Sequence, residues 1–377
     1  MMKNISFKKN TPNLILICLI NFFLHHRIVM SAEAPFGLYQ VITSHSHDLE
    51  KIEKYIDYTY LKDGRMWLVH LKPDTPKQFL SFFRPADLWN NYSFEYIPQE
   101  KSQLSSHQYS AKTTKMEMEK VLSSVDLKAL NEEVVNLSQF NSRLAGSIEN
   151  QDATQYLLNK LGGLNYKTYL QCYQKNQCNV VAEKKGFQHS DEIIIIEAHF
   201  DSVGKAQAGA DDNASGVSAL MEIARILSTQ VTNRTIHFLL TNGEEAGLHG
   251  AYAYVKKLES ENKIKSTKLV INMDMVGFNS NGIVELETDP AFAELANWYG
   301  NLVSQYTKLN PKITLGAWGS DHVPFLQKNI PSLLTIEDWN TKTPCYHLAC
   351  DKPSTINYAY MAEITKLNLA AIIEMDK

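Results

Sequence analysis

The sequence predicts an α/β protein, a three-layer sandwich in which helices cover both faces of a central, mostly parallel mixed sheet. From about residue 115 onward, runs of consecutive aliphatic residues alternate with segments whose apolar residues recur at helical spacing. The run at residues 192–198 (Glu-Ile-Ile-Ile-Ile-Glu-Ala) is typical of a strand buried on both faces. Strands that alternate with helices over more than 250 residues indicate this layered architecture.

Each element follows from its local pattern. Before residue 115 we expect a helix at residues 48–58 and a strand at residues 66–71, which together suggest a small α+β pre-domain. In the main domain, consecutive apolar residues predict buried strands at residues 192–198, 235–240 and 268–273. Helical spacing predicts helices at residues 116–137, 213–228, 247–258, 292–302 and 360–371.

The N-terminus has the order of a secretory signal. Basic residues precede an apolar run at residues 14–24, and the small residues Ser31 and Ala32 follow it. A membrane anchor is the alternative, but the run is about half of the ~20 residues that a transmembrane helix needs. We therefore expect a secreted protein that keeps no stable membrane anchor once residues 1–32 are removed.

Residues 33–112 form the pre-domain, and residues 113–377 form the main domain. The polar stretch at residues 99–114 resembles an accessible linker. A small domain between an export signal and a larger domain is commonly a propeptide. A permanent accessory domain is the alternative.

Composition excludes some partners. The formal net charge of -4 provides no basic face for nucleic acid. We expect peptide substrates as partners and a monomeric protein. Four cysteines follow the predicted signal, namely Cys172, Cys178, Cys345 and Cys350. In an oxidising compartment they indicate two short disulfide loops, although four cysteines permit three connectivities.

Acids and histidines follow the predicted strands, where functional groups of such sheets gather. They are His199 and Asp201 after the first strand, Glu244 and Glu245 after the second, Asp274 after the third, Asp211 and Asp212 at a helix start, and His347 before the last helix. Histidine and carboxylate suit zinc, and a carboxylate can bridge two ions. A metal-bound water loses its proton near neutral pH, and a free carboxylate can shuttle that proton.

Each of these residues could also have a purely structural role. His199 alone is a strand-end histidine, and Asp211 with Asp212 alone is a helix cap. Their joint placement at successive strand ends favours a metal site, in which Asp201 would orient His199. We expect His237 and His249 to be structural, because one lies within a strand and the other at a helix start.

Six ordered motifs resemble the M28 zinc peptidases, and among them the secreted bacterial leucyl-aminopeptidase-like enzymes. They are residues 198–202 (Ala-His-Phe-Asp-Ser), 209–216 (Gly-Ala-Asp-Asp-Asn-Ala-Ser-Gly), 242–247 (Asn-Gly-Glu-Glu-Ala-Gly), 272–277 (Asn-Met-Asp-Met-Val-Gly), 320–322 (Ser-Asp-His) and 346–347 (Tyr-His). The resemblance covers residues 115–377 and implies the zinc exopeptidase fold. It does not extend to residues 33–112.

The resemblance also implies roles for single residues. His199 and Asp274 would hold one zinc ion, Glu245 and His347 a second, and Asp212 would bridge the two. Glu244 would be the general base, and Asp321 would lie near the substrate groove. Beside these implied roles, we expect Asp201 to assist catalysis by fixing the tautomer of His199. The implied reaction is hydrolysis of the N-terminal amino acid from peptides.

Two departures from the best-known secreted members concern the substrate pocket and its surroundings. Residues 316–319 (Gly-Ala-Trp-Gly) lack the tyrosine and the cysteine expected there, and Cys345 and Cys350 instead flank His347. We expect the pocket to contain Met275, Trp318, Phe325 and Tyr346, which favours a bulky hydrophobic first residue such as Leu or Phe.

Three alternatives remain. Residues 320–325 and 330–333 also resemble the glutaminyl-peptide cyclotransferases, which use a single zinc, whereas residues 212–216 keep the peptidase form. A non-catalytic interaction domain is disfavoured because every predicted ligand is present. A carboxypeptidase or an endopeptidase shares the zinc core, but the short chain favours an aminopeptidase.

Overall fold

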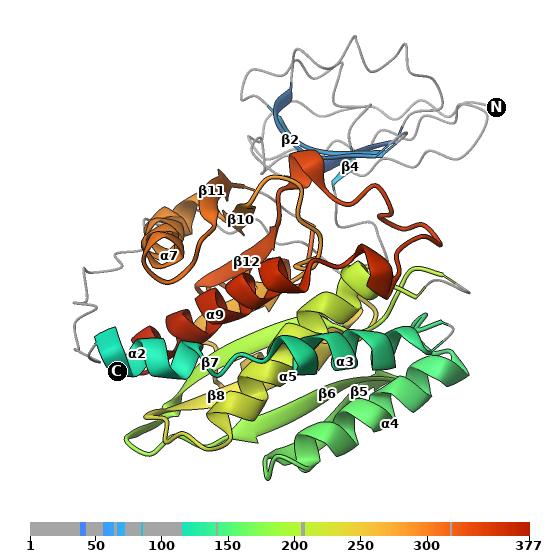
Figure 1. Ribbon diagram of the computed structural model, residues 1–377. Helices are drawn as coiled ribbons and strands as arrows, with labels where there is room; N and C mark the ends of the chain where they lie inside the picture. Colours follow the sequence, from blue (N-terminus) through green and yellow to red (C-terminus); the bar gives the residue numbers. More distant parts are fainter. Residues whose placement is uncertain are drawn as a thin grey trace, which may run out of the picture. The chain divides into compact units, whose positions relative to one another are not determined.

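The computed structural model describes residues 38–42, 56–63, 66–71, 84–85, 115–140, 142–204, 208–316 and 319–377. The chain divides into two compact units, Met1–Tyr96 and Ile97–Lys377, each with a sheet of its own (Figure 1). The predicted export signal and the predicted linker lie outside the described residues. No helix in the described part of the chain is long and apolar enough to cross a membrane.

The first unit contains a four-stranded sheet in the order β2-β3-β1-β4. Its strands are β1 (Leu38–Ile42), β2 (Ile56–Asp63), β3 (Met66–Leu71) and β4 (Arg84–Pro85). The predicted strand at residues 66–71 is confirmed. The predicted helix at residues 48–58 is wrong at its end, because Ile56 and Tyr58 belong to β2 and pair with β3. Residues 48–55 lie outside the described part.

The second unit contains an eight-stranded mixed sheet in the order β11-β10-β12-β9-β7-β8-β6-β5. Its strands are β5 (Lys167–Gln174), β6 (Gln177–Lys184), β7 (His189–His199), β8 (Arg234–Thr241), β9 (Thr267–Met273), β10 (Ile283–Thr288), β11 (Asn310–Leu315) and β12 (Ser332–Glu337). The central strands β12, β9, β7 and β8 run parallel. The predicted α/β sandwich with a mostly parallel mixed sheet is confirmed.

Helices cover both faces of this sheet. They are α2 (Lys115–Leu122), α3 (Leu127–Ser138), α4 (Ile148–Gly162), α5 (Gly216–Leu227), α6 (His249–Ser260), α7 (Ala293–Tyr306), α8 (Val323–Leu326) and α9 (Tyr358–Met375). On one face α3, α5 and α9 lie side by side (Figure 1). In β7, Ile194 and Ile196 pack toward these helices, whereas Ile193 and Ile195 pack toward α6 and α8. The two-sided burial explains the continuous apolar run of β7.

Two predicted helices have different boundaries in the structure. The helix expected at residues 116–137 is divided into α2 and α3, because the Asp126 side chain caps α3 by accepting from the amide of Lys128 at 2.8 Å. The helix expected at residues 213–228 begins at Gly216, because Asp212 and Asn213 have non-helical dihedral angles.

The strand directions position the site. Because β12, β9, β7 and β8 are parallel neighbours, their carboxyl ends meet at one edge of the sheet. The loops that leave these four ends therefore lie close together.

Candidate metal centre

Five sequence-predicted side chains converge at this edge. They are His199 at the end of β7, Asp212 before α5, Glu245 after β8, Asp274 after β9 and His347 in the loop before α9. All but His347 are largely buried, and the His347 side chain is 38% exposed. The cluster therefore opens to solvent on the side of His347.

Asp212 lies at the centre of the cluster. Its Oδ1 is 3.2 Å from Nε2 of His199, and its Oδ2 is 3.1 Å from Nε2 of His347. His199 Nε2 also lies 3.2 Å from Oδ1 of Asp274, and His347 Nε2 lies 3.2 Å from Oε2 of Glu245. Asp212 thus presents one oxygen to each of two histidine–carboxylate pairs.

The carboxylates and imidazoles of the cluster form a ligand set that suits metal cations. Burial raises the pKa of Asp212, but contacts with His199 and His347 outweigh it, and the pKa falls below its ordinary value. Burial and the Asp212 charge raise the pKa of Glu245 to about 8. Burial lowers the pKa of His347, but the contacts with Asp212 and Glu245 outweigh it and raise the pKa to about 10. Three carboxylates and two imidazoles at these distances suit zinc, and ligand atoms of His199, Asp212 and Glu245 lie within 4.8 Å of one another.

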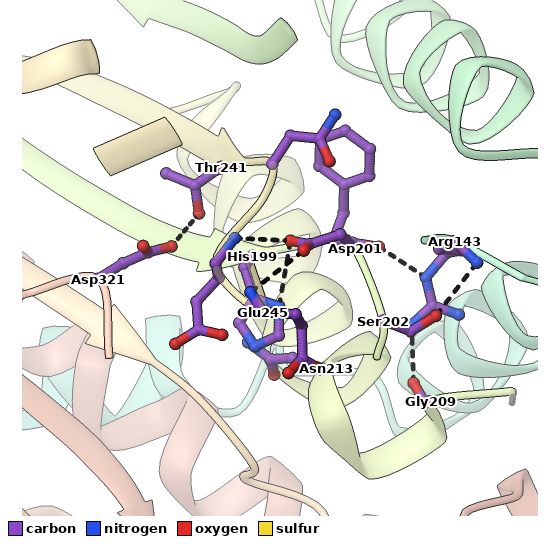
Figure 2. A network of polar contacts seen from close by, with 12 residues as sticks. Arg143, His199, Asp201, Ser202, Gly209, Asn213, Thr241, Glu245 and Asp321 are labelled. Carbon is purple, nitrogen blue, oxygen red and sulfur yellow. Dashed lines mark hydrogen bonds and ion pairs between the residues drawn. The ribbon is translucent and has the colours of Figure 1, made fainter. Parts of the chain in front are cut away.

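Asp201 connects two parts of the cluster (Figure 2). Its Oδ1 lies 3.5 Å from Nδ1 of His199. Its two oxygens accept hydrogen bonds from the amides of Glu244 and Glu245, each at 3.2 Å. One buried carboxylate can therefore orient the His199 ring and the loop that follows β8.

Glu244 lies among the predicted ligands, but its carboxylate has no hydrogen bond or ion pair to the residues that the structure describes. Burial raises the pKa of Glu244 well above its ordinary value. The charge of His199 opposes this, and the charges of Glu245 and Asp274 add to it. A carboxylate with a raised pKa, free of ligand contacts, can accept a proton near neutral pH.

Asp351 is a site residue that sequence reasoning missed. It is 3% exposed, and its Oδ1 and Oδ2 accept hydrogen bonds from the amides of Asp211 and Asp212 at 2.8 and 3.1 Å. It also lines a small pocket together with Asp212 and His347. The sequence signal that could have identified Asp351 is its position four residues after the predicted ligand His347.

Arg143 is a second missed residue. It is fully buried, and its guanidinium donates to the backbone oxygens of Leu137, Phe200, Ala208 and Gly209. These bonds hold the chain between β7 and Asp212 (Figure 2). Desolvation lowers the pKa of Arg143 to about 10, and surrounding acids including Asp351 oppose the shift.

The predicted pocket residues have different surroundings. Met275 is buried in an apolar cluster with Leu334 and Ile336, against which Trp339 and Tyr346 pack. The Tyr346 ring stacks on the ring of the predicted ligand His347, with the ring centroids 3.7 Å apart.

The other residues predicted for the substrate pocket have no described contact with the predicted metal ligands. Phe325 is fully buried in the core beneath α6, which fits a structural role. Asp321 is also fully buried and accepts a hydrogen bond from Thr241 (Figure 2). Trp318 lies outside the described residues.

Both cysteine pairs join nearest neighbours. Cys172–Cys178 links β5 to β6, and Cys345–Cys350 closes the loop that carries His347. The peptide between Asp212 and Asn213 is cis.

Comparisons with known proteins agree with the motifs. A model described as "Peptidase family M28" matches residues 179–372, just over half of the chain. The chain is 29% identical over 235 residues to the aminopeptidase YwaD of Bacillus subtilis, a match that covers 61% of this chain and 51% of that relative. The chain thus spans about half the length of this relative.

Two solved structures show the same fold. The LapA aminopeptidase of Legionella pneumophila has a TM-score of 0.70 and 20% identity, and the match covers 90% of this chain and 98% of that one. A glutaminyl cyclase of Bacteroides thetaiotaomicron has a TM-score of 0.57 and 20% identity, covering 66% of this chain and 97% of that one.

Proposed function

Since this chain belongs to peptidase family M28, we propose that it is a metal-dependent aminopeptidase that removes the N-terminal amino acid from peptides. One observation carries the proposal: the two oxygens of Asp212 face two different histidines, each beside a further carboxylate. That arrangement fits two metal ions, which would share the carboxylate of Asp212.

The proposed metal is zinc, with two ions per chain. His199 and Asp274 would hold one ion, Glu245 and His347 the other, and Asp212 both. Zinc bound there would supply Lewis-acid polarisation of the scissile carbonyl and activation of a water molecule.

The protein's own residues would then move the proton. Glu244 would accept it from the attacking water and later deliver it to the departing amine, since its carboxylate is free of ligand contacts. Asp201 would keep Nδ1 of His199 protonated, which directs Nε2 toward the metal.

The surroundings of the site support a preference for peptides whose N-terminal residue is bulky and hydrophobic. Met275, Leu334 and Ile336 form an apolar wall next to Asp274, and Tyr346 extends it to His347. Cyclisation of N-terminal glutamine on a single zinc is the alternative on this fold. The paired arrangement around Asp212 favours two ions, and so hydrolysis.

The deciding experiment combines metal analysis with two assays on the purified protein. We expect about two zinc ions per chain, release of amine from a leucine anilide, and no cyclisation of a glutamine peptide. Cyclisation with one zinc ion would overturn the proposal in favour of the cyclotransferase.

We also propose that the enzyme is an exported monomer, with residues 1–32 as its signal and residues 33–112 as a propeptide or accessory domain. N-terminal sequencing of the exported protein would test the signal boundary. Release of residues 33–112 would separate the two options for the pre-domain.

A further inference from the structure

Asn213 is a fully buried polar residue that the proposed mechanism does not use. It directly follows the predicted bridging ligand Asp212 and lies before α5. Its Nδ2 donates to the backbone oxygen of Met273 at 2.9 Å, and its Oδ1 accepts from the amide of Met275 at 3.3 Å. The residue between these two partners is the predicted ligand Asp274, so Asn213 binds the chain on both sides of that ligand.

The turn after Asp274 depends on contacts of this kind. Met275 has a φ of 49°, in the left-handed region that is unfavourable for a residue with a Cβ. Its amide donates to Asn213, and its carbonyl oxygen accepts from the amide of Glu337 at 2.9 Å. Loss of the Asn213 contact would therefore release the backbone that carries the Asp274 side chain.

The segment that contains the bridging ligand binds the rest of this turn as well. The amide of Val276 donates to Oγ of Ser215 at 3.0 Å, and the amide of Gly277 donates to Oδ1 of Asp211 at 2.8 Å. Three successive amides of the turn thus donate to side chains of residues 211–215. Of these side chains, Asn213 is the one that also binds the peptide group before the ligand.

Gly216 permits the close approach of the two segments. Its amide donates to Oδ1 of Asn213 at 2.8 Å, which fixes the orientation of the Asn213 side chain. A Cβ at this position would overlap with the backbone oxygen of Met273 and with Oδ1 of Asn213. Glycine is therefore the residue that fits between α5 and the end of β9.

The Asp274 side chain has one oxygen left for the metal centre. Its Oδ2 accepts from the hydroxyl of Ser320 at 2.7 Å, whereas its Oδ1 lies 3.2 Å from Nε2 of His199. The position of Oδ1 follows from the backbone that Asn213 holds.

We propose that Asn213 is a positioning residue for the zinc site of His199 and Asp274, because it fixes the peptide groups on both sides of Asp274. The inference rests on the proposed function, which assigns the ligands. Among the described residues, no hydrogen bond joins the Asn213 side chain to Glu245 or His347. The effect of Asn213 is therefore selective for one of the two zinc ions.

Zinc affinity in two variant backgrounds tests whether Asn213 acts through Asp274. Asn213→Ala is introduced into His347→Ala and into Asp274→Ala, and competition with a chromogenic chelator measures zinc binding. In His347→Ala the remaining site includes Asp274, and Asn213→Ala should weaken zinc binding there about 10- to 100-fold. In Asp274→Ala the remaining site lacks that ligand, and Asn213→Ala should leave its affinity unchanged. Equal losses in both backgrounds, or no loss in either, would overturn the proposal.

Ser218→Ala is the matched control on the same helix. Ser218 is 1% exposed, and its hydroxyl donates to the backbone oxygen of Leu130 at 2.8 Å. The variant therefore loses a buried hydrogen bond of α5 that does not involve the turn after Asp274. Its zinc affinity should match that of each background. A loss as large as that of Asn213→Ala would assign the effect to a weakened helix and contradict the proposal.

Hydrogen exchange of the metal-free protein tests the same contact without zinc. The Met275 amide should exchange about 2- to 10-fold faster in Asn213→Ala than in wild type, the usual effect of one lost hydrogen bond, and Ser218→Ala should match wild type. If wild type hydrolyses no leucine anilide, the proposed function fails, while faster exchange in Asn213→Ala still supports the positioning role. Exchange of the Met275 amide at the wild-type rate would refute that role, whatever the activity.

Discussion

The carboxylate of Asp351 accepts a hydrogen bond from the amide of Asp212 at 3.1 Å, and its other oxygen accepts from the neighbouring amide of Asp211 at 2.8 Å. Asp351 directly follows Cys350, at the end of the disulfide loop that carries His347. The backbone of the predicted bridging ligand is thus attached to the segment that supplies another ligand. Displacement of one would displace the other.

We predict that Asp351→Ala weakens zinc binding about 10- to 100-fold, the usual effect of losing a residue that orients metal ligands. The substitution leaves two buried amides without an acceptor and frees the turn before α5. Competition with a chromogenic chelator measures the affinity. The exposed neighbour Lys352 provides the control: Lys352→Ala should bind zinc like wild type, and equal affinity of Asp351→Ala would refute the prediction.

The two adjacent glutamates should differ when each becomes glutamine. Glu244→Gln should retain zinc and lose about 10²- to 10⁴-fold in kcat, because it removes proton transfer and no predicted ligand. Glu245→Gln should lose zinc, because it removes the carboxylate that faces His347 at 3.2 Å. Zinc content by elemental analysis and kcat on a leucine anilide distinguish the two. The reverse pattern would exchange their roles.

The sequence was sufficient for the centre of the fold because β7, β8 and β9 are buried on both faces and read as continuous apolar runs. Strands β10 and β11 were missed for two different reasons. The two glutamates of β10 interrupt its apolar pattern although the strand is buried, and β11 is half exposed at the edge of the sheet. Such strands have no distinct signal until their neighbours are known.

The predicted ligands converge because they follow parallel strand ends, a relationship that sequence order preserves. Asp351 and Arg143 act through backbone amides and carbonyls instead, and such contacts depend on the folded path of the chain.

The two disulfides should differ in their effect on the metal centre. Replacing either pair with serine should lower the free energy of unfolding by roughly 2 kcal/mol, from the loop entropy of so short a link. Only Cys345→Ser/Cys350→Ser should also weaken zinc binding, because that loop carries His347. Urea unfolding and chelator competition on both double variants provide the measurements. Equal zinc affinity in the two would show that the loop holds His347 without its disulfide.

His237 should contribute to acid sensitivity, independently of the metal. It is buried within β8, where its Nδ1 is 2.7 Å from the hydroxyl of Tyr254. Burial lowers the pKa of His237 to about 4, and the charge of Glu183 opposes this only in part. The unfolded chain binds this proton near pH 6.5, so the contribution of His237 to stability is present above that pH and is lost as the pH falls toward 4. The full loss is about 3 kcal/mol.

Urea unfolding of the metal-free protein at pH 7 and 4.5 measures this loss. The free energy of unfolding should fall less between the two pH values for His237→Gln than for wild type. His189→Gln, at an exposed position, should lose as much as wild type. Equal losses of unfolding free energy in all three proteins would mean that the folded protein does not disfavour protonation of His237.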